Sequence, residues 1–302
     1  MKNYLATLKK GYHEPGRAIK KAISMLPLHS LEDDLYLKVL YYVVFGKMLD
    51  LTNPKTYTEK IQWLKLYDRN PLYSMLADKL TCRDYVRKLI GEEHLIPLVG
   101  GPWLSVDEID FCSLPNQYVL KCTHDSGSAI ICDNVALGEQ KKILRRLDKS
   151  LNKNLFYDSR EWVYRSIVPQ IIAEKLLLDN YRLPNDFKFF CFDGEPCFVN
   201  ITSGRDLQSH TVYNDYFDID FIHQPFTFGN PNAILKPSKP ENFDELVQYA
   251  RLLSKGIRHV RVDLYCIQTK IYFGELTFYP QAGLVKIRPE KYDEIIGKLV
   301  RI

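Results

Sequence analysis

Two stretches near the C-terminus alternate between apolar and polar residues, and this pattern constrains the fold more than any other feature of the chain. They are His259–Cys266 and Ile271–Phe278. Such alternation is typical of half-buried β-strands, because successive side chains point to opposite faces. The first strand places Arg261 and Asp263 on one face, and the second places Glu275 and Thr277 on one face. A short turn separates the two stretches, so they are expected to pair as a hairpin.

This pairing brings two carboxylates, a hydroxyl and a guanidinium to one side of a sheet. Mg²⁺ binds one or two protein carboxylates together with phosphate oxygens and water. Asp263 and Glu275 are therefore candidate magnesium ligands. A plain surface ion pair between Arg261 and Glu275 would explain the same pattern, and the strand pair by itself does not choose between the two interpretations.

The rest of the sequence indicates an α+β chain with a helical N-terminal third and a mostly antiparallel C-terminal core. Asp193-Gly194 lies between two strand-like runs and is a strong hairpin signal. Thr56 and Glu59 can form a capping box at the start of a helix. Helical patterns cover 31–90, 139–167 and 241–256, strand patterns cover 118–123, 129–132, 171–177, 187–192 and 197–201, and 205–240 is rich in loops.

Composition argues against several classes of protein. The seven cysteines are an odd number without a CxxC pair, which argues for a reducing compartment and against a disulfide framework or zinc site. A net charge of +4 is too small to indicate nucleic acid binding. The most apolar stretch, Leu35 to Phe45, is interrupted by Lys38 and is shorter than the ~20 residues that span a bilayer. With no N-terminal signal pattern, the chain is expected in the cytoplasm.

Residues 1–30 are basic and contain helix-breaking glycine and proline. One interpretation is contact with anionic lipid head groups at the inner face of the membrane. The other is a solvated terminus without a partner.

Three further groups of polar residues are candidate ligand sites. Lys121 interrupts an apolar strand, where it either extends to the surface or meets an anion, and the loop 124–128 that follows could form an anion-binding nest. The Glu174-Lys175 pair lies in another apolar strand, where a polar strand exit could meet the edge of a base. Asp186 and Lys188 face the same way on the next strand, although a surface ion pair would also explain them.

The order of these features is the layout of the ATP-grasp fold. The chain resembles the TupA-like (teichuronopeptide biosynthesis) branch of ATP-grasp proteins over nearly its whole length after residue ~50. The segments that carry the resemblance are NPKTYTEKIQWLKLYDRNP at 53–71, YVLKCTH at 118–124, DFKFFCFDG at 186–194 and FGELTFYP at 273–280.

The resemblance implies a helical N-terminal lobe followed by two α+β subdomains whose antiparallel sheets clamp ATP. In this sequence the parts would be a basic arm and helix at 1–50, a helical lobe at 51–115, a small subdomain with the glycine loop at 116–178, and a C-terminal subdomain with the metal site at 179–302.

The resemblance also implies which residues bind Mg-ATP. Two lysines would reach the phosphates, the glycine loop would close over the nucleotide, a Glu-Lys-x-Leu hinge would hold adenine, and an acid would bind ribose. These residues are Lys79, Lys121, Ser126, Gly127, Ser128, Glu174, Lys175, Leu177 and Asp186. The implied magnesium ligands are Asp263, Glu275 and Thr277, with threonine where the wider superfamily usually has asparagine. The expected catalytic residues are Arg261, Lys188 and Arg205, of which Arg261 would steady the transferring phosphoryl group.

The activity implied is that of a carboxylate–amine ligase working through an acyl phosphate. The implied substrates are a uronic acid or similar carboxylate of a cell-surface polysaccharide precursor, free or lipid-linked, and an amine or amino acid. No protein nucleophile is required, which fits a sequence without a convincing Cys-His or Ser-His pair. The alternatives are a glycosyltransferase, for which Asp218-Ile219-Asp220 has the DxD spacing, an ATP-grasp kinase acting on a hydroxyl, and a catalytically silent ATP-binding scaffold.

Overall fold

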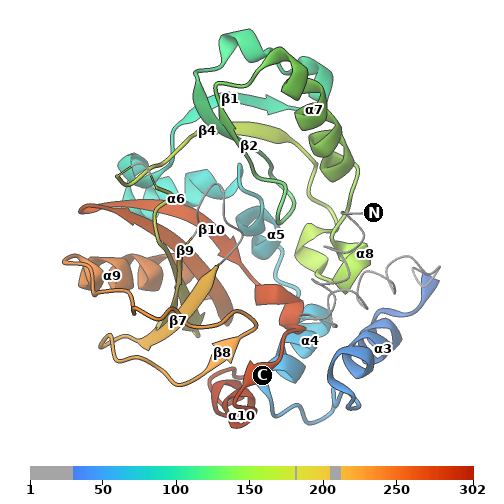
Figure 1. Ribbon diagram of the computed structural model, residues 1–302. Helices are drawn as coiled ribbons and strands as arrows, with labels where there is room; N and C mark the ends of the chain where they lie inside the picture. Colours follow the sequence, from blue (N-terminus) through green and yellow to red (C-terminus); the bar gives the residue numbers. More distant parts are fainter. Residues whose placement is uncertain (1–29, 181, 205–211) are drawn as a thin grey trace.

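The structure is a computed structural model that describes residues 30–180, 182–204 and 212–302 (Figure 1). The basic N-terminal arm and Arg205 lie outside the described residues, so the predictions made for them stay predictions. Helices in the described part are α3 Asp33–Phe45, α4 Tyr57–Tyr67, α5 Leu72–Ala77, α6 Cys82–Ile90, α7 Leu137–Leu151, α8 Phe156–Ser159, α9 Phe243–Ser254 and α10 Lys291–Gly297. Among these helices, none has the length and apolar character needed to cross a bilayer.

The strands form a large sheet, a small sheet and a short two-stranded ladder. The large sheet has the order β10-β9-β5-β6-β7, the small sheet the order β1-β4-β2-β3, and the ladder joins β11 to β8. Their bounds are β1 Leu98–Trp103, β2 Gln117–Cys122, β3 Ile130–Asp133, β4 Ile171–Lys175, β5 Asp186–Phe192, β6 Glu195–Ser203, β7 Tyr213–Asp218, β8 Thr227–Phe228, β9 His259–Ile267, β10 Lys270–Thr277 and β11 Ile287–Arg288.

The predicted hairpins are confirmed. Strands β9 and β10 pair antiparallel, as do β5 and β6, whose turn residues Asp193 and Gly194 both have positive φ, as hairpin turns of this type require. The capping box is also present, because Thr56 accepts from Glu59 N while the Glu59 carboxylate accepts from Thr56 N.

The helical pattern at 31–90 is present as four helices, which loops at 46–56 and 68–71 and a turn at 78–81 separate. Two other expectations about secondary structure are wrong. The helix expected over 139–167 is interrupted: α7 ends at Leu151, and α8 ends at Ser159, where the C-cap residue Arg160 adopts a left-handed conformation with φ 55°. Finally, strand β7 lies in the region expected to be loop. Its polar residues Asn214 and Asp215 are buried and hydrogen-bonded, so polarity concealed the strand.

Strand β1 is an element that the sequence pattern did not indicate. It contains two glycines and a proline, and its pairing with β4 is irregular in register. It lies inside the range assigned above to a helical lobe, and it completes the small sheet. The division into four parts stays a prediction.

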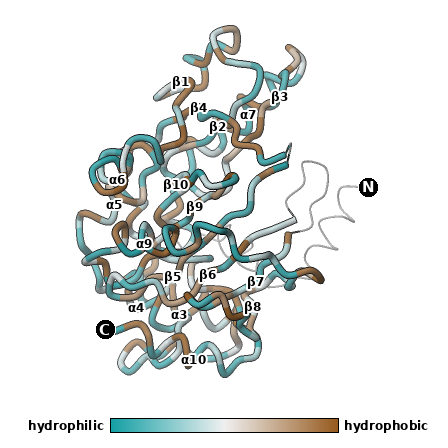
Figure 2. Tube along the Cα trace, turned by 90° about the vertical axis from the view of Figure 1, so that its left-hand side faces the viewer, coloured by the Kyte–Doolittle hydropathy of each residue, from teal (hydrophilic) through white to brown (hydrophobic). Residues whose placement is uncertain are grey.

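The large sheet is packed on both faces. One face carries Val260, Val262 and Leu264, all fully buried, and α9 packs against it, with the rings of Phe189 and Phe243 6.0 Å apart. In the small sheet, α7 packs against β2 and buries Leu147. Along the outer helices the chain changes repeatedly between hydrophilic and hydrophobic residues (Figure 2), as expected of helices with one face on the core.

Candidate nucleotide and metal site

A cavity of about 280 Å³ lies between the small sheet and the large sheet. Every residue predicted to bind the cofactor lines it, and three residues predicted to act in metal binding or catalysis join them. The former are Lys79, Lys121, Ser126, Gly127, Ser128, Glu174, Lys175, Leu177 and Asp186, and the latter are Lys188, Asp263 and Glu275. The structure therefore brings these residues together from distant parts of the sequence, while their individual roles stay predictions.

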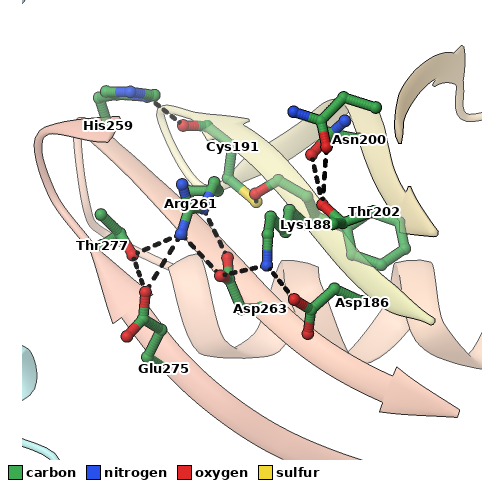
Figure 3. A network of polar contacts seen from close by, with 12 residues as sticks. Asp186, Lys188, Cys191, Asn200, Thr202, His259, Arg261, Asp263, Glu275 and Thr277 are labelled. Carbon is green, nitrogen blue, oxygen red and sulfur yellow. Dashed lines mark hydrogen bonds and ion pairs between the residues drawn. The ribbon is translucent and has the colours of Figure 1, made fainter. Parts of the chain in front are cut away.

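The charged wall of the cavity is a row of side chains across the large sheet (Figure 3). Arg261 binds Asp263 through two hydrogen bonds of 2.6 Å, from Nε to Oδ1 and from Nη2 to Oδ2. The same Nη2 donates to Glu275 Oε1 at 3.1 Å and to Thr277 Oγ1 at 3.0 Å. Thr277 in turn donates to Glu275 at 2.8 Å. The Arg261–Glu275 pair considered above is therefore present, with the Glu275 side chain 31% exposed, and it belongs to a larger network that includes the buried Asp263.

A bulge at Gly274 places Glu275 and Thr277 on the same face of the large sheet as Arg261 and Asp263. Phe273 lies opposite Leu264, yet Glu275 lies opposite Asp263, so β10 contains a one-residue bulge at Gly274. Without the bulge, regular alternation would place Glu275 on the apolar face beside Val262. A Cβ at Gly274 would lie 3.1 Å from the Asp263 carbonyl oxygen, so the close approach favours glycine.

The next strand across the sheet adds a cation. Lys188 lies opposite Asp263 on β5, and its Nζ is 3.2 Å from Asp263 Oδ2 and 2.5 Å from Asp186 Oδ2. Asp186 is 4% exposed. Asp186 and Asp263 are therefore buried, Lys188 is partly buried, and all three are charge-paired, so the predicted Asp186–Lys188 pair is present.

The opposite wall comes from the small sheet. Lys121 forms an ion pair of 2.6 Å with Glu174, and Arg83 lies 3.7 Å from the same carboxylate. Lys121 thus pairs with a carboxylate of the protein, and its contact with a phosphate stays a prediction. Arg83 was not predicted, and its signal in the sequence is weak because it lies on an amphipathic helix rich in charged residues.

The glycine loop closes over one end of the cavity. Ser128 donates to Asp125 Oδ1 at 2.5 Å and accepts from Cys122 N at 2.9 Å, which fixes the loop to the end of β2. The Lys79 ammonium donates to the Asp125 carbonyl. These contacts place a lysine from the turn between α5 and α6 beside the loop.

The local charges hold Glu275 in its ionised form. Burial alone would raise the pKa of Glu275, but the positive charges of Lys79, Arg261 and Lys188 lower the pKa to about 2. Burial would lower the pKa of Arg261, and the adjacent Asp263 carboxylate outweighs this and raises it. An anionic carboxylate surrounded by cations is suited to binding a metal together with phosphate groups.

The donor set fits Mg²⁺. Within residues 30–180, 182–204 and 212–302, no three histidine, cysteine, aspartate or glutamate side chains are grouped so as to hold a metal ion. Asp263 and Glu275 nevertheless present two carboxylates directly opposite one another on rigid strands. This matches the one or two protein carboxylates that Mg²⁺ takes when phosphate oxygens and water complete its shell.

The DxD-like sequence lies in a turn. Asp218 Oδ1 accepts from the backbone N–H groups of Asp220 and Ile222, and its Oδ2 accepts from Gln224 Nε2. Asp218 therefore stabilises the turn after β7, and this role accounts for the spacing without a sugar-nucleotide site.

Two antiparallel sheets that enclose a cavity, with lysines from each lobe facing paired carboxylates, define the ATP-grasp class, whose enzymes bind ATP. The chain belongs to the TupA-like ATP-grasp family, whose model matches residues 59–301. The match confirms the family resemblance and the α+β ATP-grasp fold. A search of functionally curated proteins gives no match to this chain.

The solved structures that this chain resembles share little sequence identity with it. An L-amino acid ligase from Bacillus licheniformis is 14% identical with a TM-score of 0.47, over 86% of this chain and 58% of its own. A D-alanine–D-alanine ligase from Helicobacter pylori is 11% identical with a TM-score of 0.45, over 81% and 69%. A D-alanine–D-alanine ligase from Bacillus anthracis complexed with ATP is 13% identical with a TM-score of 0.39, over 68% and 55%. The chain thus spans little more than half the length of two of these enzymes.

Proposed function

We propose that the protein is an ATP-dependent carboxylate–amine ligase that works through an acyl phosphate. The proposed acceptor is a uronic acid or similar carboxylate of a cell-surface polysaccharide precursor, and the second substrate is an amine or amino acid. The observation that carries the proposal is the cavity between the two sheets, which Lys79, Lys121 and Lys188 line together with the carboxylates Asp263 and Glu275.

In this proposal the cavity between the two sheets binds ATP. Lys79 and Lys121 neutralise the phosphates, and the loop 126–128 covers them. The strand exit at 174–177 holds adenine, partly through its backbone, and Asp186 binds the ribose. Asp263, Glu275 and Thr277 would hold Mg²⁺, which when bound would offset the negative charge on the phosphates.

The chain's own contribution to the reaction is positioning and charge stabilisation. An acceptor carboxylate oxygen attacks the γ-phosphorus, and the bond to ADP breaks. The amine then attacks the acyl carbon, phosphate leaves with the bonding electron pair, and the amine loses a proton. Arg261 is held in place by three side chains, so its guanidinium is preorganised to stabilise the charge of the transferring phosphoryl group. Lys188, and Arg205 outside the described residues, would assist.

The reaction products test this proposal. We expect ADP and phosphate release from ATP to require a carboxylate, and a stable amide to form only when an amine is added. Mass spectrometry of the product distinguishes the alternatives: a phosphate ester would identify a kinase, and a new glycosidic bond would identify a glycosyltransferase. Equal ATP turnover with every carboxylate and amine left out would contradict the ligase mechanism.

A further inference from the structure

A second cavity of about 410 Å³ adjoins the first. Ser126 and Glu275 line both cavities, whereas Arg261 and Thr277 line only the second of these two. The charged network therefore separates the two spaces, and Arg261 forms part of the wall of the second one. A group bound there would lie next to the residues proposed to act on the γ-phosphoryl group.

The walls of the second cavity are rich in groups that form hydrogen bonds. They include hydroxyls, phenols, an amide and carboxylates, contributed by Ser159, Thr277, Tyr164, Tyr279, Gln281, Asp158 and Glu161. Hydrogen-bonding side chains beside the aromatic rings of two tyrosines suit a ligand whose own ring carries several hydroxyl groups.

The backbone around this cavity is held in an unusual conformation. Arg160, which lies between two lining residues, has φ 55°, and the lining residues Gln281 and Ala282 have φ 52° and 58°. Left-handed backbone at residues other than glycine is strained, and it persists only where the surroundings enforce it. Such residues are concentrated at ligand sites.

A single buried ammonium joins the two strained segments. Lys65 on α4 is fully buried, and its Nζ donates to Ser159 O at 2.9 Å and to Ala282 O at 2.7 Å. It also donates to Gln62 Oε1 at 2.9 Å. The Gln62 amide in turn donates to Ala282 O at 3.1 Å and Gly283 O at 2.9 Å. One helix thus ties both walls of the cavity together.

The turn formed by Gln281, Ala282 and Gly283 packs closely against α4. Gly283 has φ 60°, and a Cβ there would lie 2.5 Å from Ile61 on the same helix. Ala282 also belongs to the hydrophobic cluster formed with α3. The position of α4 therefore determines the shape of the wall formed by Gln281 and Ala282.

We propose that the second cavity binds the acceptor, a polyhydroxylated acid about the size of a sugar, with its carboxylate at Arg261, and that Lys65 is a positioning residue that sets the cavity's shape. The proposal rests on the proposed function for the reaction that follows binding. Lys65 touches neither substrate in this assignment and acts through Ser159 and Ala282.

The test compares Lys65→Met with a matched control, Lys60→Met. Lys60 lies on the same helix, and its ammonium donates to Val300 O at 2.7 Å, away from the second cavity. ADP release is measured with D-glucuronate and D-galacturonate as acceptors and with ammonium, L-alanine and L-glutamate as amines, and ATP affinity is measured by calorimetry. We expect Lys65→Met to raise the KM for the sugar acid at least ~10-fold while the Kd for ATP stays unchanged. Lys60→Met should alter neither quantity.

A second variant covers the case in which Lys65→Met does not fold. Val285 is half-buried and lines the cavity, so Val285→Trp should fill the space and abolish sugar-acid-dependent ADP release without weakening ATP binding. Unchanged sugar-acid KM in the folded variants would overturn the assignment. If the wild-type protein binds ATP but neither sugar acid promotes ADP release, the proposed acceptor class is wrong while the nucleotide site stands. If the wild-type protein does not bind ATP, the proposed function itself fails.

Discussion

Two ends of one face of the large sheet differ in charge although a residue at each end is equally buried: one end is neutral, and the other carries charged side chains. His259 and Asp263 lie on the same face of β9, four residues apart, and each is 3% exposed. At one end His259 packs against the ring of Phe192, with centroids 4.7 Å apart, and bonds to Tyr57 and the Cys191 carbonyl. At the other end Asp263 lies among charged side chains.

The comparison shows that burial acts at both ends and that paired charges offset it to different degrees: they lower the pKa of Glu275, whereas burial still raises the pKa of Asp263. Burial lowers the pKa of His259 to about 4, because its partners are a phenol and a carbonyl that offer no negative charge. Arg261 is 12% exposed, and the carboxylates of Asp263 and Glu275 pair with its charge. Buried charges are costly unless they are paired, so the sheet confines them to the end that meets the cavity.

The largest expected effect follows from removing the central cation of the charged end. Arg261→Met keeps most of the side-chain volume but leaves Asp263 and Glu275 without their shared partner. We expect kcat to fall about 100- to 1000-fold, as loss of one preorganised charge-stabilising group does, with ATP affinity changed much less. Steady-state ADP release and calorimetry check this. Arg251→Met is the control, since Arg251 forms an exposed pair with Glu195. A parallel loss of ATP affinity would show that Arg261 serves binding and not transfer.

The next largest effect is the pH dependence of stability that His259 causes at the neutral end of the sheet face. The folded pKa of His259, about 4, lies below the ordinary value of 6.5. Between these values the unfolded state binds more protons, so stability is complete above pH 6.5 and falls as pH falls toward 4. The loss can reach about 3 kcal/mol, from 1.36 kcal/mol per pKa unit. His259→Gln should flatten this part of the curve, measured by urea unfolding at several pH values.

Glu275 at the charged end should titrate in a different window. The pKa of Glu275 is lowered from 4.5 to about 2, so its contribution is complete above pH 4.5 and is lost as pH falls toward 2. Glu275 therefore adds no slope above pH 4.5. Burial raises the pKa of Asp263 above its ordinary value of 3.8, so Asp263 gives a slope of the opposite sign in the window of His259, and the difference between wild type and His259→Gln isolates the histidine. An equally steep slope in His259→Gln would show that the two ends do not titrate separately.

The sequence was sufficient to predict part of the charged end, because short-range alternation determines which face a strand residue takes. Arg261 and Asp263 follow directly from this rule. Glu275 and Thr277 required more, since the bulge at Gly274 reverses the alternation of β10. The signal is visible in hindsight: apolar residues occupy odd positions at Ile271 and Phe273 and even positions from Leu276 onward.

Long-range geometry was not predictable in the same way. The irregular strand β1 and the polar strand β7 have composition typical of loops, and their partners in the sheet stabilise them. The role of Lys65 was also hidden, because a lysine on a helix normally indicates a solvated face. Its partners include oxygens of Gln62, Ser159 and Ala282, and the last two are separated from it in sequence by 94 and 217 residues.

The smallest effect tests a departure from the superfamily within the charged end. The Thr277 hydroxyl accepts from Arg261 and donates to Glu275. Thr277→Val removes both hydrogen bonds, but Arg261 and Glu275 still pair with one another, so no charge is left without a partner. The expected cost is about 1 kcal/mol, or roughly a fivefold fall in kcat. Thr277→Asn can accept and donate at the same two partners, so we expect it to retain near wild-type turnover in the ADP release assay. The opposite result, with full turnover for Thr277→Val and a loss for Thr277→Asn, would contradict this expectation. It would show that the hydrogen bonds of the Thr277 hydroxyl to Arg261 and Glu275 do not matter for turnover and that the space at this position is too small for asparagine.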